Sequence, residues 1–148
     1  MTVISNSSPL IALSRVGILF VFRDLFGKVY IPDTVWRETV LQSSCNVQKE
    51  NILKAADDGF VIVETPTVNR SFRRAIDSGE RGVLNLAFNK NADILIIDDK
   101  KARNEAMEIG FRVAKTSTLL RRAEKRRIIS SYRKVLEELE RFQIYLPN

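Results

Sequence analysis

The chain has 148 residues, of which 45% are hydrophobic, enough for one folded domain over residues 1–148 with a core of its own. It has one cysteine and no histidine, which excludes an internal disulfide, a Cys/His zinc site and any serine or cysteine triad with a histidine base. The net charge of +6 is compatible with a polyanionic partner, although such a balance also occurs in proteins that bind none.

The first segment, Met1 to Phe22, contains apolar stretches that the polar run Ser5–Pro9 interrupts. Its first basic residue is Arg15. This pattern fits neither a signal peptide nor a membrane-spanning helix, so we expect a cytoplasmic protein without membrane contact.

Short apolar runs alternate with segments of helical spacing along the whole chain. The predicted strands are Thr2 to Ser5, Lys28 to Ile31, Gly59 to Val63, Asp93 to Ile97 and Phe111 to Val113. The alternation predicts an α/β fold of three layers, with a parallel central sheet of about five strands flanked by helices.

Glycine and proline mark the ends of the predicted helices. A glycine follows each of several periodic segments, where a left-handed residue ends a helix most easily: Gly17, Gly27, Gly59 and Gly110. Pro32 suits the first turn of a helix that contains Trp36 and Glu38. The segment Gly79 to Asn91 is apolar on more than one side, which predicts a buried helix with Ser78 as its N-cap.

The C-terminal part carries an amphipathic helix and a basic run. One helix face holds Tyr132, Val135, Leu136, Leu139 and Phe142, which predicts packing or a homodimer contact. The run Arg121 to Arg127 has five basic residues and one acid, and it is either a solvated helix face or a binding groove. The last segment, Gln143 to Asn148, is either a small edge strand or an ordered tail.

Polar oxygen ligands follow the predicted strands or open the predicted helices. Asp98 and Asp99 come directly after a strand that is apolar throughout, and such a strand is covered on both faces of a parallel sheet. Asn6 follows the first strand, while Glu38 and Glu80 lie in helices. Since ligands of such sheets gather at the carboxyl ends of the strands, we expect these side chains to converge there. Without histidine, hydrolysis at this edge would depend on carboxylates that hold a hard cation.

Each of these residues also has a structural explanation. Glu80 favours the positive end of a helix dipole, Asn6 can cap the first helix, and Glu38 can be an exposed helix residue. One acid of the pair Asp98 and Asp99 can cap the helix that begins near Lys100. Two adjacent acids raise each other's pKa unless water, donors or a cation compensates.

Four segments in this order resemble the PIN domain family, in particular a prokaryotic and archaeal branch: Val3 to Leu13, Tyr30 to Glu38, Ser78 to Glu80 and Ile96 to Arg103. The resemblance covers nearly the whole chain. It implies a parallel sheet flanked by helices and metal-dependent cleavage of phosphodiester bonds in RNA or DNA. Many bacterial and archaeal members are endoribonuclease toxins of type II toxin-antitoxin pairs, so it also implies a small antitoxin protein as partner.

The resemblance places the family's acidic positions on Asn6, Glu38, Glu80 and Asp99, which it makes ligands of Mg²⁺ or Mn²⁺. The implied catalytic set is Glu38, Glu80, Asp98 and Asp99. Asn6 departs from the family pattern, because aspartate is usual at that position. Motif spacing favours Asp99 as the ligand, whereas nearness to the strand favours Asp98.

A magnesium ion keeps several waters and needs only one or two protein carboxylates, so the remaining acids suffice for one ion, with a second recruited with substrate. Lys101 and Arg103 lie near the proposed site and are the candidates for contacts with substrate phosphates. The alternative function is a degenerate PIN-like module that binds nucleic acid or a protein without cleavage. A receiver-like signalling domain is disfavoured, because its acid pair would follow the first strand.

Overall fold

The computed structural model describes residues 1–147 and shows a five-stranded sheet in the order β3-β2-β1-β4-β5. Each neighbouring pair of strands is parallel. The strands are β1 (Val3–Ser5), β2 (Val29–Pro32), β3 (Val61–Glu64), β4 (Ile94–Ile96) and β5 (Val113–Ala114). The predicted parallel α/β architecture is therefore confirmed.

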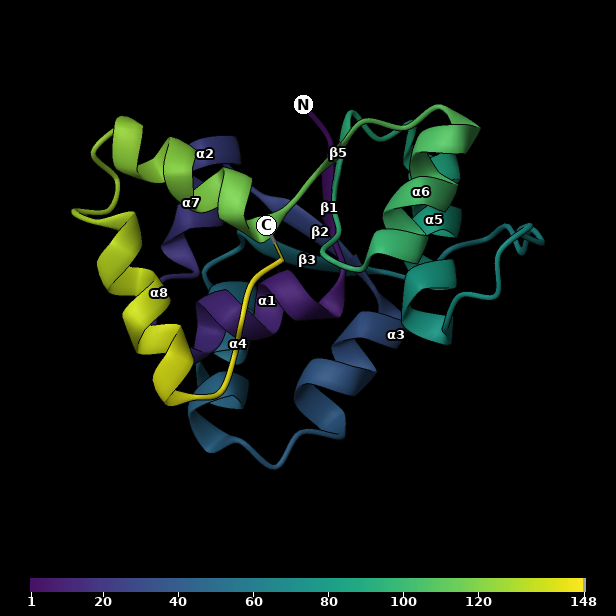
Figure 1. Ribbon diagram of the computed structural model, residues 1–148. Helices are drawn as coiled ribbons and strands as arrows, with labels where there is room; N and C mark the ends of the chain where they lie inside the picture. The colour runs from purple at the N-terminus through teal and green to yellow at the C-terminus, as the bar shows by residue number, and fades with distance from the viewer. Residues whose placement is uncertain (148) are drawn as a thin grey trace.

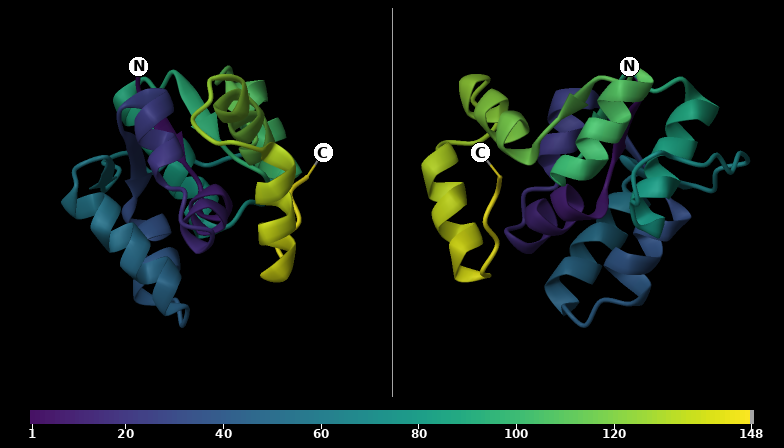
Figure 2. Two further views of the ribbon diagram at one scale, coloured as in Figure 1. Left: turned by 90° about the vertical axis from the view of Figure 1, so that its left-hand side faces the viewer. Right: turned by 45° about the vertical axis from the view of Figure 1, so that its right-hand side comes forward.

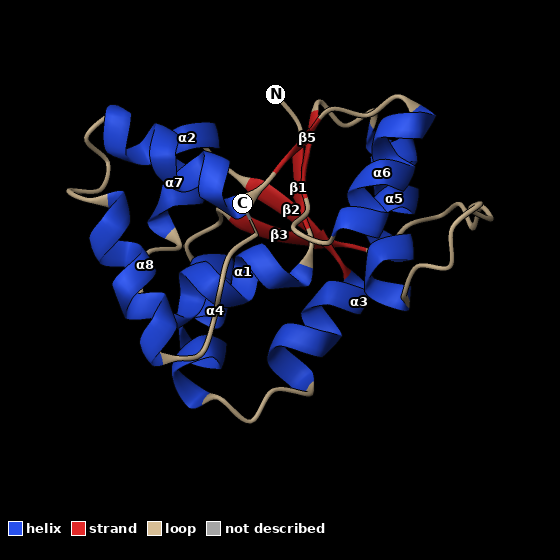
Figure 3. Cartoon of the chain, in the orientation of Figure 1, coloured by secondary structure: helices blue, strands red, loops and turns tan. Residues whose placement is uncertain are grey.

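Helices cover both faces of the sheet (Figures 1 and 3). One face carries α5 (Ser78–Lys90) and α6 (Lys100–Ile109). The other carries α1 (Ser7–Arg15), α2 (Phe20–Phe26), α4 (Asn46–Asp57) and α7 (Thr116–Lys125). The helix α8 (Tyr132–Arg141) lies outside α7, as the turned views show (Figure 2). None of the helices within residues 1–147 is long and apolar enough to cross a lipid bilayer.

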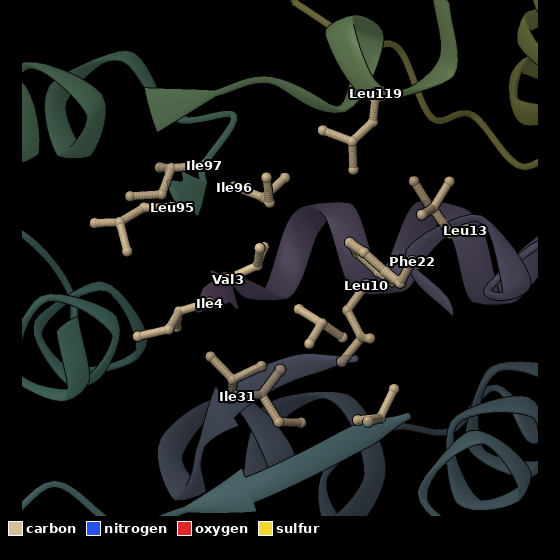
Figure 4. Close-up of a cluster of buried hydrophobic side chains, with 14 of the residues drawn as sticks. Val3, Ile4, Leu10, Leu13, Phe22, Ile31, Leu95, Ile96, Ile97 and Leu119 are labelled. Atoms are coloured by element: carbon tan, nitrogen blue, oxygen red, sulfur yellow. The ribbon is translucent and has the colours of Figure 1, made fainter. Parts of the chain in front are cut away.

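The core lies around the two central strands, β1 and β4. Val3, Ile4, Leu95 and Ile96 are completely buried, as expected for inner strands of a parallel sheet that helices cover on both faces. Leu10, Leu13 and Phe22 from α1 and α2 gather beside these strands (Figure 4). Each fully buried Leu, Ile or Phe side chain stabilises the fold by about 1.5–3 kcal/mol, so this packing fixes where the strands end.

The observed strand boundaries differ from the predicted ones by one or two residues. The last strand begins at Val113 instead of Phe111, because pairing with β4 extends to Ala114, which is in register with Ile96. Register between strands sets these ends, and hydrophobicity alone does not reveal it.

All four glycines that were predicted to end helices have positive φ angles. The segment after α8 joins no strand within the described residues, and Asn148 lies outside them.

The sequence predicted Pro32 in the first turn of a helix, but the structure places it just before the helix. It is the last residue of β2 and the N-cap of α3 (Asp33–Trp36), with φ −72° and ψ 160°. The extended conformation lets Pro32 end the strand beside Glu64 of β3. The helix therefore starts one residue later than the sequence pattern suggests.

The segment that connects β3 to α5, residues 65–77, is called here the arginine loop. Side chains of α5 and α6 accept hydrogen bonds from its backbone amides: Asn89 from Thr67 (2.8 Å), Asn85 from Arg70 (2.9 Å), and Glu105 from Arg73 (2.9 Å) and Arg74 (3.2 Å). The loop thus lies along both helices and leads directly into the start of α5.

Ion pairs add to these contacts at the α6 end of the loop. Arg74 bonds Glu105 at 2.8 Å and Glu108 at 2.6 Å, and Arg73 also bonds Glu108. Burial of Glu105 acts to raise its pKa, but the hydrogen bonds from Arg74 and from the two loop amides outweigh it and lower the pKa below 4.5. The hydrogen bond from Arg74 also lowers the pKa of Glu108.

We expect these contacts to depend on pH. Because the pKa of Glu105 is lower in the folded state, its stabilising effect is complete above pH 4.5 and disappears as the pH falls through the folded-state value. Hydrogen exchange should show the Arg73 and Arg74 amides protected at pH 7 and progressively less protected below pH 4.5, after correction for intrinsic rates. The Arg70 amide is the internal control, because its acceptor, Asn85, does not titrate. Unchanged protection of Arg73 and Arg74 in acid would contradict the prediction.

Candidate active site

The carboxyl ends of β1 and β4 meet directly. The backbone amide of Asn6 donates to the Ile96 carbonyl at 3.0 Å, so the residue after β1 lies against the end of β4. Asn6 occupies the N-cap position of α1, as predicted, but its side chain makes no capping hydrogen bond. Within residues 1–147 this side chain has no hydrogen-bond partner, although Asn6 is only 6% exposed. The side-chain amide of Asn6 is therefore available to a ligand or a water at this edge.

Glu38 lies in a π-helical turn that continues directly from a short α-helix. The helix α3 ends at Trp36, and Arg37–Leu41 forms a π-helical turn in which the Gln42 amide donates to the Arg37 carbonyl at 2.8 Å. The predicted helix that contains Trp36 and Glu38 is therefore present, but its geometry changes from α-helical to π-helical at Arg37. Such turns insert one extra residue, which changes the direction of the side chains, and they are frequent at functional sites.

The π-helical turn brings Glu38 to Ser7 and to the start of α5. The Ser7 hydroxyl donates to Glu38 Oε2 at 2.9 Å. A Cβ atom at Gly79 would overlap Glu38 Oε1 and lie 3.2 Å from Cδ. The absence of a side chain at Gly79 therefore provides the space that the Glu38 carboxylate occupies.

Glu80 belongs to the N-terminal cap of α5. The Glu80 amide donates to Asp77 Oδ1 at 2.8 Å, and the Asp77 amide donates to Glu80 Oε1 at 3.0 Å. The N-cap is thus Asp77, whereas the sequence analysis predicted Ser78. The spacing Asp-x-x-Glu is a capping-box pattern, so the sequence contained the signal for Asp77.

Glu80 is only 8% exposed, and the Asp99 carboxyl lies close enough to influence its pKa. Burial raises the pKa of Glu80, and the negative charges of Asp77 and Asp99 raise it further, against the opposing hydrogen bond from the Asp77 amide. Two acids that are distant in sequence therefore form a close pair at the end of β4.

Asp98 and Asp99 have different environments. Both carboxylate oxygens of Asp98 accept hydrogen bonds from Thr116, from its amide at 2.8 Å and its hydroxyl at 2.7 Å, and the Asp98 carbonyl accepts from Arg103. Asp99 caps α6 by accepting from the Ala102 amide at 2.9 Å, while its carboxyl faces Glu80. Asp98 thus anchors α7, and Asp99 is the member of the pair at the acidic edge.

The structure brings the predicted residues to one edge but not into one cluster. Among the residues it describes, no three His, Cys, Asp or Glu side chains are grouped closely enough to hold a metal ion as they stand. Glu80 and Asp99 form the close pair, whereas Glu38 is held by Ser7 beside Gly79.

The two predicted phosphate contacts are engaged within the fold. Lys101 Nζ donates to the Ala75 carbonyl at 3.3 Å, and Arg103 bonds the Asp98 carbonyl. Both residues belong to the first turns of α6, which begins next to Asp99. Three further residues position the acids: Ser7 and Gly79 contact Glu38, and Thr116 binds Asp98. Their residue types alone did not indicate these contacts.

The raised pKa of Glu80 predicts that its charge destabilises the fold. The folded state favours the protonated carboxyl, so the ionised form is unfavourable at neutral pH and the penalty disappears below pH 4.5, where folded and unfolded states are both protonated. We expect Glu80→Gln to raise Tm at pH 7, by about 2–4 °C for each kcal/mol of relief, and to have little effect at pH 3.5.

The matched control is Glu50→Gln, the same change at an exposed position of α4. It should leave Tm nearly unchanged at both values of pH. If Glu80→Gln lowers Tm at pH 7, the repulsion inferred for the acid pair does not govern stability.

Comparison with known proteins agrees with this architecture. A family model described as PIN domain matches residues 2–148. The fold is similar to that of a PilT N-terminus domain protein from the hyperthermophilic archaeon Sulfolobus solfataricus P2, with a TM-score of 0.63 and 21% identity over 83% of this chain and 93% of that chain. No match was found among curated proteins. Because the family model spans nearly the whole sequence, the chain belongs to the PIN domain family.

Proposed function

We propose that this protein is a metal-dependent endoribonuclease that cleaves phosphodiester bonds in single-stranded RNA. PIN domains are generally nucleases. The observation that carries the proposal is the nearness of the Asp99 carboxyl to the buried Glu80 carboxyl at the carboxyl edge of the sheet, where it raises the pKa of Glu80. Like charges are brought together there at a cost to the fold, which is typical of a site that binds a cation or performs chemistry.

The donor set at this edge fits Mg²⁺ or Mn²⁺. It offers carboxylate and amide oxygens, which hard cations prefer, and includes no histidine or thiolate. In this proposal Glu80 and Asp99 hold the ion, the Asn6 amide contributes an oxygen or orients a water, and Glu38 completes the set by turning from Ser7. Such an ion, when bound, activates water and stabilises charge on the phosphoryl oxygens.

The other residues at this edge position the donors. Ser7 and Gly79 determine where the Glu38 carboxylate lies, and the Asp98 bonds to Thr116 fix the end of β4. Lys101 lies in the first turn of α6, two residues after Asp99. In this proposal it contacts substrate phosphate, exchanging its hydrogen bond with Ala75 for one to RNA.

The proposal extends to a biological role. We infer from the family resemblance that the protein acts as the toxin of a type II toxin-antitoxin pair, restrained by a small antitoxin protein. A short reading frame with a DNA-binding pattern directly beside the gene, whose product copurifies with this protein and blocks cleavage, would support this role.

One observation favours the alternative of a module that binds nucleic acid without cleavage. Asn6 supplies a neutral amide where an acid would add a negative charge, which weakens the hold on a second ion. Salt-sensitive binding of RNA without cleavage in the presence of Mn²⁺ would establish this alternative.

The direct test is cleavage of a labelled single-stranded RNA of mixed sequence, with DNA of the same sequence in parallel. We expect cleavage with Mg²⁺ or Mn²⁺ and none with EDTA. Asp99→Asn keeps the helix-capping oxygen but removes the charge, and should reduce the rate by about 100-fold or more, since even partners outside the ligand set cost 10–100-fold. Asp57→Asn, the same change at the far end of α4, is the control. Equal rates for both variants would refute the assignment of the site.

A second test uses the space at Gly79. Gly79→Ala adds a methyl group that displaces the Glu38 carboxylate without changing any charge. We expect binding of Mn²⁺, measured by calorimetry, to weaken by about tenfold, equivalent to about 1.4 kcal/mol, while the fold is retained. Ser78→Ala, at the exposed neighbouring position, should bind Mn²⁺ as the unmodified protein does. Unchanged affinity in Gly79→Ala would place Glu38 outside the ion's ligands.

A further inference from the structure

A hollow of about 380 Å³ opens at the edge of the sheet opposite the acidic site. It lies between α2, β5 and α7, and Ile94, the first residue of β4, forms part of its wall. The acids Asp98 and Asp99 follow the other end of that strand. The hollow is therefore separate from the candidate active site.

The floor of the hollow is apolar. Leu25 and Phe26 from the end of α2, Ile94 from β4 and Leu119 from α7 line it. Leu119 is buried, and the other three are half-buried. A surface of this kind suits a large aliphatic side chain more than a stack of bases, which requires flat aromatic faces.

Three arginines surround this floor, namely Arg112, Arg122 and Arg126. All three are exposed, and within residues 1–147 none of their guanidinium groups makes an ion pair or hydrogen bond. No acidic side chain lines the hollow. This differs from the arginine loop, where Arg73 and Arg74 are paired with Glu105 and Glu108. The unpaired cations give the hollow a positive charge that nothing in the described chain balances.

The hollow also runs beside an edge strand. Arg112, Val113 and Ala114 line it, and β5 is the outermost strand, paired on one side with β4. An exposed strand edge offers backbone groups to an extended peptide, whose alternate side chains then reach the neighbouring surface.

We propose that this hollow is the docking site for an acidic, partly aliphatic segment of a partner protein. A leucine-like side chain enters the apolar floor, and flanking carboxylates pair with Arg112, Arg122 and Arg126. Arginine binds carboxylates through two parallel hydrogen bonds, which gives such a segment preference over other apolar peptides. The proposal does not depend on nuclease activity, because the site lies at the other edge of the sheet.

The test uses a fluorescein-labelled octapeptide of alternating glutamate and leucine, with glutamate–serine and lysine–leucine peptides as comparisons. We expect saturable binding, by fluorescence anisotropy, of the glutamate–leucine peptide alone. Its addition should shift the amide resonances of Val113, Ala114 and Thr118, which line the hollow. No saturable binding at millimolar peptide, or shifts located elsewhere, would overturn the proposal.

A pair of charge-reversal variants separates the hollow from the overall charge. Arg122→Glu with Arg126→Glu should weaken binding by about tenfold or more, because the reversed charges repel the carboxylates of the peptide. Lys125→Glu with Arg127→Glu makes the same change in the same basic run but outside the hollow. Equal weakening in both variants would mean that binding follows net charge alone.

The competing occupant is nucleic acid. An oligouridylate that displaces the glutamate–leucine peptide and depends on Arg122 and Arg126 would overturn the proposal in favour of an RNA surface. The anisotropy measurement requires no cleavage, so failure of the nuclease assay and failure of this proposal are distinguishable.

Discussion

The side-by-side pairing of β1 and β4 is the constraint on which the rest of the structure depends. Both strands are buried on both faces, so their register is fixed by packing, and the Asn6 amide bonds the carbonyl that ends β4. The residues that follow the two strands are then forced to the same edge. Asn6 and Asp99, more than ninety positions apart, share that edge because the core places them there.

Hydrogen bonds that cap two helices offset the unfavourable free energy of placing acidic side chains together at this edge. Glu80 and Asp99 each accept a backbone hydrogen bond at the start of a helix, where the dipole favours negative charge. These bonds hold the two carboxyls in place although burial and the neighbouring negative charges oppose the ionisation of Glu80. A single arrangement therefore begins two helices and concentrates charge, which is why the structural and functional explanations of these residues are compatible.

The parallel sheet, its helical layers and the common edge were accessible from the sequence, because uninterrupted apolar runs and helix-ending glycines have direct physical meaning. The orientation of the acids was not. Asp98 is held by Thr116, a residue eighteen positions further along the chain that carries no pattern of its own, whereas Asp99 caps α6. The π-helical turn at Arg37–Leu41 packs against α4 and α1, and the apolar runs of the sequence do not encode it. The sequence could not show which residues of the basic run Arg121 to Arg127 border the hollow, because charge along a helix does not reveal which side chains face a neighbouring element.

The hydrogen bonds between Asp98 and Thr116 join two distant parts of the molecule mechanically. The helix α7 begins at Thr116 and spans ten residues, about 15 Å, and it ends beside the hollow with its arginines. One helix thus contributes both to the edge that holds Asp98 and to the lining of the hollow, through Leu119, Arg122 and the neighbouring Arg126.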